Sequence, residues 1–107
     1  MGVLTLREEI ILSVLVLLGG SSGGVPIRNK IIELTGKEIV YGTLYNRMEY
    51  LMRKGYVTTH KSDPVPVQGG RSKTIYTITK AGRAALQETM GLHELIRRHL
   101  KDMEFEA

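Results

Sequence analysis

Residues 41–79 constrain the fold more than any other part of the sequence, because a helical pattern there leads directly into two strand patterns. Leu44, Met48 and Leu51 fall at positions i, i+4 and i+7, which predicts a helix with one apolar face. The helix is expected to begin at residues 41–43 and to end at Lys54, because a glycine follows. The opposite face of this helix is polar and aromatic.

Two segments after this helix, residues 56–60 and 73–79, are rich in the valine, isoleucine, threonine and tyrosine that favour strands. The loop between them contains two prolines and then Gly-Gly-Arg-Ser-Lys at residues 69–73. Prolines stiffen such a loop, while paired glycines permit a tight turn. The segment therefore predicts a helix backed by a β-hairpin with a basic tip.

A helix is also predicted near the start of the chain. Thr5 and Glu8 have the spacing of a capping box, in which each side chain satisfies a free amide at a helix start. The apolar residues that follow form a stripe too wide for burial on one side, so we expect this helix to pack on two surfaces. Gly19–Gly24 ends it and is expected to be a flexible connector, because its glycine spacing does not fit a phosphate-binding loop.

Two further helices complete the expected set. One begins near Pro26, a favoured first-turn residue, and stops at Gly36. The other is capped by Thr79 and runs from about residue 80 to residue 103. The order α-α-α-β-β-α predicts a mostly helical α+β fold, a winged helix-turn-helix with an added C-terminal helix. We expect residues 1–79 to form a winged helix DNA-binding domain and residues 80–107 a dimerisation helix.

Positive charge gathers in the helix and hairpin. The chain has a net charge of +4. Residues 43–76 hold six basic and two acidic residues, whereas residues 79–107 hold five of each. This distribution suits a polyanionic partner. No cysteine is present, which excludes disulfides, zinc–thiolate sites and cysteine nucleophiles.

A helix with one polar face and a hairpin with a basic tip can place side chains in a DNA groove and on the adjacent backbone. Short polar residues and arginine suit base edges, and tyrosine hydroxyls and wing-tip charges suit phosphates. The alternative is that the tyrosines pack in the core and that the charges only solubilise the surface. The candidate DNA-binding residues are Tyr41, Thr43, Tyr45, Asn46, Arg47, Tyr50, Gly70, Arg71, Ser72 and Lys73.

The last helix carries an apolar stripe that one helix of a small domain cannot bury alone. Pairing with a second copy, and with the first helix, would bury it and relate two DNA-binding faces by a two-fold axis. The predicted dimer-interface residues are Leu15, Leu92, Leu95, Ile96, His99, Leu100 and Met103.

An enzyme is the least favoured class, because the sequence shows no nucleophile–base pair and no phosphate loop. His93 and His99 are six residues apart, on different sides of a helix, so we predict no metal site and no cofactor. The apolar run at residues 10–18 is far shorter than a membrane span, and the residues before it lack the positive charge of a signal peptide. The expected location is cytoplasmic, without a membrane partner.

Five short motifs, in order, resemble the PadR family of bacterial transcriptional regulators. They are Leu4–Glu8, Tyr41–Tyr45, Lys54–Val57, Gly69–Arg71 with Tyr76, and Thr79–Gly82. The resemblance covers residues 4–86 and implies a homodimeric winged helix, usually a repressor, whose C-terminal helix builds the dimer. By that resemblance Gly42–Tyr45 opens the recognition helix and Gly69–Arg71 forms the wing tip.

The chain departs from the family pattern in two ways. Gly23 and Gly24 stand where members often have Tyr-Gly, and the tail has room for only one helix. Some compact members bind aromatic ligands through tryptophan, and that mode cannot be transferred because this chain has no tryptophan. The expected function is a ligand-responsive repressor that binds a palindromic operator as a homodimer. Its expected partners are double-stranded DNA, a second copy and a small-molecule effector. The alternative is a winged-helix protein-interaction module without DNA binding.

Overall fold

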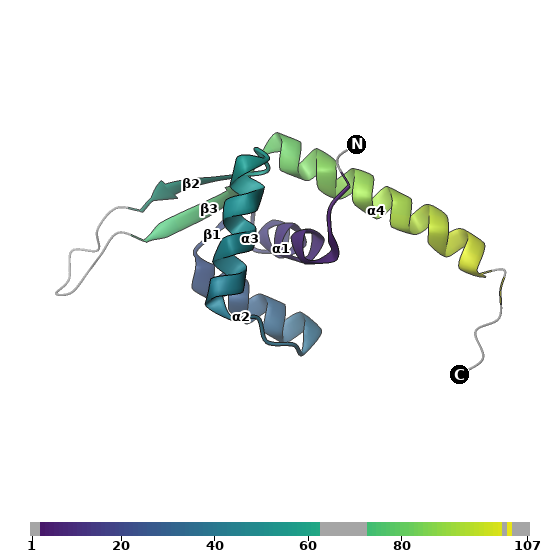
Figure 1. The fold of residues 1–107 in the computed structure, drawn as a ribbon, viewed down its shortest axis with the longest axis horizontal. Helices are drawn as coiled ribbons and strands as arrows, with labels where there is room; N and C mark the ends of the chain where they lie inside the picture. Colours follow the sequence, from purple (N-terminus) through teal and green to yellow (C-terminus); the bar gives the residue numbers. More distant parts are fainter. Residues whose placement is uncertain (1–2, 63–72, 102, 104–107) are drawn as a thin grey trace.

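The computed structural model describes residues 3–62, 73–101 and 103. Its element order is α1 (Leu6–Leu17), β1 (Ser21–Ser22), α2 (Gly24–Thr35), α3 (Tyr41–Arg53), β2 (Val57–Lys61), β3 (Thr74–Ile78) and α4 (Lys80–Lys101). Helix α1 lies between α3 and α4, the β2–β3 hairpin extends to one side, and α4 extends to the other (Figure 1). The winged-helix architecture with an added C-terminal helix is as predicted.

The helix boundaries follow the local signals in the sequence. The Thr5 hydroxyl accepts the Glu8 amide at 3.3 Å, and the Glu8 carboxylate accepts the Thr5 amide at 2.9 Å, so the capping box is confirmed. Gly36 ends α2 in the left-handed region at φ 70°. Thr79 starts α4, because its hydroxyl accepts the Gly82 amide at 3.0 Å.

The connector between α1 and α2 contains a strand that was not predicted. Ser21 and Ser22 form β1, which pairs antiparallel with β3 in a three-stranded sheet of order β1-β3-β2. The preceding glycines, Gly19 and Gly20, have φ values of 92° and 98°, which turn the chain back toward the sheet. The Gly20 carbonyl accepts the Ile78 amide at 2.9 Å. The prediction of a flexible connector is therefore wrong.

The hydrophobic core forms around α1, which contacts α2, α3, α4 and β3. Leu12, Leu15, Ile27, Leu44 and Leu51 are fully buried in it. The first turns of α4 complete the core through Gly82, Ala85, Leu86 and Thr89. The first helix was expected to pack on two surfaces, and it does so against other elements of its own chain.

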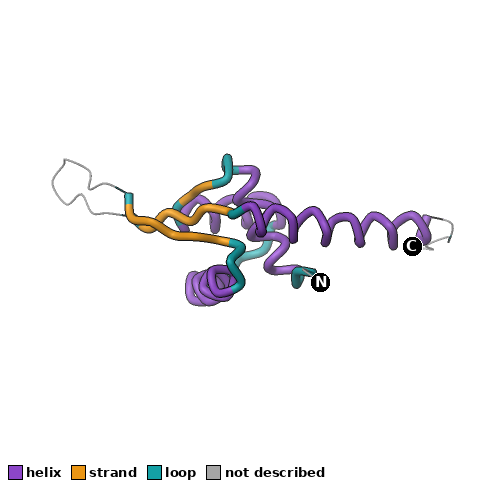
Figure 2. Tube along the Cα trace, turned by 90° about the horizontal axis from the view of Figure 1, so that it is seen from above, coloured by secondary structure: helices purple, strands orange, loops and turns teal. Residues whose placement is uncertain are grey.

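The remainder of α4 leaves the body of the molecule. In two views at right angles, its C-terminal half extends beyond all other described elements (Figures 1 and 2). The molecule measures 59 × 30 × 22 Å along its principal axes. Among the helices of the described residues, none has the length and apolar character needed to cross a membrane.

Candidate nucleic-acid interface

Helix α3 has one buried face and one exposed face. Leu44, Met48 and Leu51 are buried at the predicted spacing and fix the rotation of the helix about its axis. Asn46 and Tyr50 are exposed on the other side. An exposed amide near the N-terminal half of such a helix can donate to and accept from the edge of one base.

An ion pair lies on the same exposed face. The Arg53 guanidinium donates to the Glu49 carboxylate at 3.1 Å, and both side chains are well exposed. The positive charge counted for this face is therefore partly balanced within α3 itself. Asn46 is left as the short polar side chain at the centre of the face.

Three tyrosines stack along the side of α3 that meets the sheet. The ring centres of Tyr41 and Tyr45 are 5.8 Å apart, and those of Tyr45 and Tyr76 are 6.4 Å apart. The Arg28 guanidinium lies 4.8 Å from the centre of the Tyr41 ring and donates to the Ile39 carbonyl at 2.7 Å. Tyr41 and Tyr45 therefore pack against neighbouring rings and still remain partly exposed, at 37% and 42%.

Tyr76 is the buried end of this stack. Burial raises the pKa of its hydroxyl above the ordinary value of 10.0, and the neighbouring Tyr45 raises it further. The hydroxyl is therefore neutral at physiological pH. A hollow of about 660 Å³ opens beside the stack, lined by Gly23, Gly24, Val25, Pro26, Tyr45, Lys73, Thr74, Ile75 and Tyr76.

Thr43 and Arg47 lie on the flank of α3 and are half-buried. Thr43 lines a groove of about 410 Å³ between α1 and the link from α2 to α3. The two residues therefore offer less of their side chains to a ligand of the exposed face than Asn46 does. The other residues that line the groove are Leu6, Arg7, Ile10, Ile11, Ile31, Thr35, Lys37, Glu38, Ile39 and Val40.

At the end of the described part of the hairpin, hydrogen bonds join its two sides. The Ser62 amide donates to the Lys73 carbonyl at 2.8 Å, and the Lys73 amide donates to the Ser62 hydroxyl at 2.9 Å. The Lys61 ammonium donates to the Thr74 hydroxyl at 2.8 Å. Lys73 is exposed at this point. The other predicted wing residues, Gly70, Arg71 and Ser72, lie outside the described residues.

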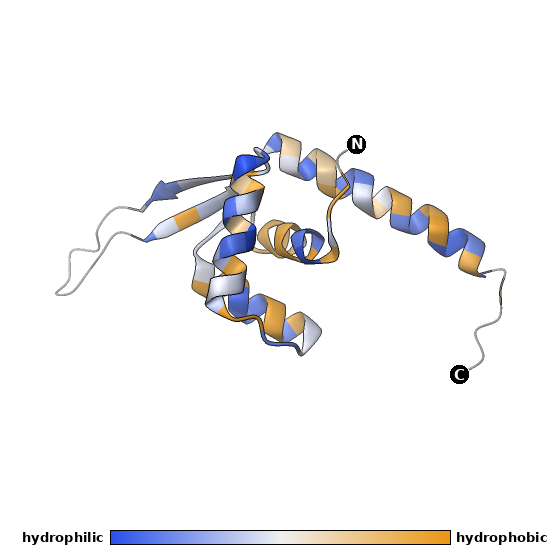
Figure 3. Ribbon diagram, in the orientation of Figure 1, coloured by the Kyte–Doolittle hydropathy of each residue, from blue (hydrophilic) through white to orange (hydrophobic). Residues whose placement is uncertain are grey.

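The predicted dimer stripe on α4 is solvent-exposed in the single chain, and apolar residues alternate with polar ones along the projecting half of the helix (Figure 3). Its members in the described residues are Leu92, Leu95, Ile96, His99, Leu100 and Met103. No other described element covers this face, so it is available to a partner.

Leu15 does not belong with these residues. Its side chain is 0% exposed within the core of one chain, so it cannot contact a second copy directly. The prediction failed because α1 is apolar on nearly all sides, and the pattern does not show which side faces the core. The exposed apolar residues of α1 are Leu6, Val16 and Leu17.

Three basic residues have roles that the sequence pattern did not reveal. Arg28 holds the link before α3, Lys61 joins the two hairpin strands, and Lys54 reaches the buried carboxylate of Glu8 at 3.5 Å. The partners of Arg28 and Lys54 are 11 and 46 positions away, so no local spacing signals them. The Lys61 contact is easier to predict from the sequence, because a hairpin pairs Lys61 with Thr74 across its two strands. In the described part of the chain, no group of acidic residues and histidines could hold a metal ion.

Comparisons with known proteins agree with this geometry. The model of the transcriptional regulator PadR-like family matches residues 11–88. A transcriptional regulator from Clostridium thermocellum is 25% identical, with a TM-score of 0.71 and 92% of each chain covered. A PadR-like transcription factor from Bacteroides fragilis is 18% identical, with a TM-score of 0.71 over 92% of this chain and 93% of that one.

A third structure is of Bacillus subtilis PadR in complex with operator DNA. It is 21% identical, with a TM-score of 0.65 over 79% of this chain and 46% of that one. The comparison with curated proteins returned no match.

Proposed function

Because the chain belongs to the PadR-like family of transcriptional regulators, we propose that it acts by binding an operator DNA sequence as a homodimer. The family is one of regulators and not of enzymes. The observation that carries the proposal is the placement of α3. Its apolar face is locked in the core, and Asn46 stands on the opposite face beside a hairpin that carries basic residues.

In this proposal α3 is the recognition helix and enters the major groove. Asn46 reads a base edge, for which adenine is the geometric match of an asparagine amide. The hydroxyls of the partly exposed residues Tyr41, Tyr45 and Tyr50 donate to phosphates beside the groove. Thr43 and Arg47 contact the DNA from the flank. The wing, with Arg71 and Lys73, follows the backbone and supplies attraction that depends on salt.

The second copy binds through the projecting half of α4. The first turns of α4 belong to the core of one chain, so the dimerisation segment of this proposal begins after Thr89. Burial of the exposed stripe from Leu92 to Met103 would stabilise the dimer. A two-fold axis through the paired helices then places two recognition helices on half-sites one DNA turn apart, roughly 34–36 Å.

Repression, and release by a small-molecule effector, are the parts of the proposal that rest on the family resemblance alone. The competing function is a winged-helix module that binds another protein. The exposed amide of α3 and the basic hairpin favour DNA over that alternative, because neither feature helps to bury apolar surface.

The test of DNA binding is selection of genomic DNA fragments by the purified full-length protein, followed by gel shifts with the selected site. We expect a palindromic site whose affinity falls steeply as salt rises. Recovery of random fragments with no shared sequence would contradict sequence-specific binding. Failure to bind any DNA at low salt would favour the protein-interaction module.

Replacement of the base-reading amide is expected to relax sequence preference. In Asn46→Ala, discrimination between the operator and a variant with one changed base pair should fall by about 1–3 kcal/mol at one position of each half-site. Competition binding with single-base operator variants measures this. Asn29→Ala is the matched control, because Asn29 is the exposed asparagine of α2. A base preference equal in Asn46→Ala and the parent protein would show that Asn46 reads no base.

Replacement of a wing charge is expected to weaken binding to all sequences alike. Arg71→Ala should reduce the slope of log affinity against log salt by about 1, because one phosphate contact releases about one counterion. Titrations of operator and unrelated DNA at several salt concentrations measure this slope. Arg97→Ala on the exposed side of α4 is the control and should leave the slope unchanged. An unchanged slope in Arg71→Ala would remove the residue from the interface.

A further inference from the structure

The C-terminal end of α3 is held from inside the molecule by Lys54. The Lys54 ammonium lies 3.5 Å from a carboxylate oxygen of Glu8, 4.7 Å from the centre of the Tyr50 ring and 6.0 Å from that of Tyr56. The Lys54 side chain is 34% exposed, and that of Glu8 is 0% exposed. The Lys54 ammonium is therefore engaged by groups of its own chain, while its side chain stays about one-third exposed.

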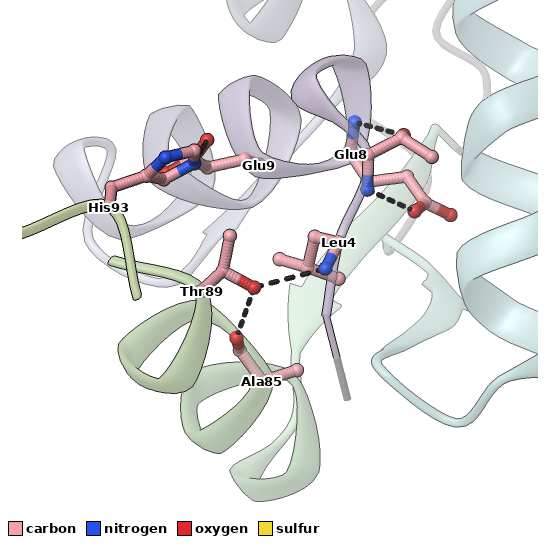
Figure 4. Close-up of polar contacts among 7 residues, drawn as sticks. Leu4, Glu8, Glu9, Ala85, Thr89 and His93 are labelled. Atoms are coloured by element: carbon pink, nitrogen blue, oxygen red, sulfur yellow. Dashed lines mark hydrogen bonds and ion pairs between the residues drawn. The ribbon is translucent and has the colours of Figure 1, made fainter. Parts of the chain in front are cut away.

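The Glu8 carboxylate joins this lysine to the start of α1. One of its oxygens accepts the Lys54 ammonium, and the other accepts the Thr5 amide at 2.9 Å. The adjacent Leu4 amide donates to the Thr89 hydroxyl of α4 at 3.0 Å, and that hydroxyl donates to the Ala85 carbonyl at 2.8 Å (Figure 4). Two sets of polar contacts, joined by the backbone between Leu4 and Thr5, therefore connect the end of α3 to the middle of α4.

A second contact fixes α1 against α4 near the same place. The His93 imidazole and the Glu9 carboxylate are 3.0 Å apart, and both residues are labelled in Figure 4. His93 lies on α4 just beyond the last buried residue of that helix, Thr89. The point where α4 leaves the core is thus tied to α1, and α1 is tied to the end of α3.

We propose that Lys54 is a positioning residue that fixes the angle between the recognition helix and α4, and so sets the half-site spacing that the dimer accepts. This inference rests on the proposed function, in which α4 builds the dimer and α3 reads DNA. The two recognition helices of a dimer are then connected only through their own α4 helices, so the α3–α4 angle determines their separation. The ion pair restricts that angle, because displacement of Lys54 leaves the fully buried carboxylate of Glu8 without its charged partner.

The experiment compares operators whose half-sites are moved apart or together by one and two base pairs. The parent protein, Lys54→Met, Lys54→Arg and the double variant Glu8→Gln/Lys54→Met are titrated with each operator. The double variant keeps an amide oxygen at position 8 for the Thr5 amide and leaves no buried charge without a partner. It therefore separates loss of the tether from loss of the fold, which thermal melts and light scattering check independently.

We expect the parent to prefer one spacing and the double variant to lose roughly two- to thirtyfold of that preference, the range that side-chain networks carry between coupled sites. Lys54→Arg should keep the preference, because it can still reach the carboxylate. Binding to an isolated half-site should stay near the parent value in all variants. A merely structural lysine would instead change all operators in proportion to the fraction of folded protein.

Three results would overturn the inference. The first is a double variant that is folded, dimeric and as selective for spacing as the parent. The second is a drop of about one in the salt slope with no change in spacing preference, because that would make Lys54 a phosphate contact. The third is a parent protein that binds no DNA, which would overturn the proposed function together with this inference.

Discussion

Ile96→Asp is expected to convert the protein from a dimer into a folded monomer that no longer binds its operator. The Ile96 side chain is 60% exposed in one chain, within the apolar stripe of α4 and beyond the last residue that packs on the core. Burial of an unpaired carboxylate in an apolar interface costs several kcal/mol. A two-fold interface contains the substitution twice. Each ~1.4 kcal/mol weakens association tenfold.

Light scattering and sedimentation over a range of concentrations measure this effect, and a gel shift reads out the loss of operator binding. Lys101→Asp is the control, because it introduces the same carboxylate, with a larger change of charge (−2 against −1), at an exposed position of the same helix outside the apolar stripe. Circular dichroism should show the helical content of the parent, since Ile96 supports no contact within the core of its own chain. A dimer of unchanged strength in Ile96→Asp would remove the α4 interface from the proposed function.

Gly82→Ala is expected to destabilise the fold more than any other single methyl group added to α4. An alanine Cβ at position 82 would collide with the Tyr56 carbonyl oxygen and lie 2.9 Å from a side-chain carbon of Ile78. The Tyr56 carbonyl cannot move freely, because it accepts the Thr79 amide at 2.9 Å at the start of α4. Overpacking of this kind typically costs about 1–3 kcal/mol, which exceeds the ~1 kcal/mol that alanine gains over glycine within a helix.

Gly91→Ala supplies the opposite result in the same helix. Apart from its two chain neighbours and the backbone of its own helix turn, nothing lies within 4 Å of the Cβ that this change would add, so the gain in helix propensity, about 1 kcal/mol, remains. Urea unfolding at one fixed protein concentration compares the two variants with the parent. A Gly82→Ala protein as stable as the parent would show that α4 and Tyr56 are less closely packed than the structure describes.

Local signals predicted most of this fold. The Thr5–Glu8 capping box and the stops at Gly36 and Gly55 are short-range features, and the structure places helix ends at all of them. Strand β1 escaped prediction because two serines between glycines have neither strand composition nor alternation. Its stability comes from pairing with residues more than fifty positions away, such as Thr77, which bonds the Ser21 hydroxyl at 2.7 Å.

In the candidate site, too, features set by local spacing were predicted, and features set by distant contacts were not. The exposed position of Asn46 followed from the period of the buried residues on its own helix, and the structure agrees. The Glu8–Lys54 pair depends on how α1 packs against the end of α3. The spacing of residues within one helix does not predict this arrangement. Leu15 was misplaced for a related reason, because the burial of α1 is decided by five other elements. Assignment of individual residues to DNA contacts stays a prediction.

The link between Leu4 and Thr89 has a consequence for synthesis of the chain on the ribosome. Helix α1 is made before several of the elements that cover it, which include β3 and the first turns of α4. The hydrogen bond between the Leu4 amide and the Thr89 hydroxyl joins positions 85 residues apart. The apolar surface of α1 is therefore not completely covered until the first turns of α4 emerge. We expect the domain to fold late and as one unit, at the slow pace that distant contacts impose.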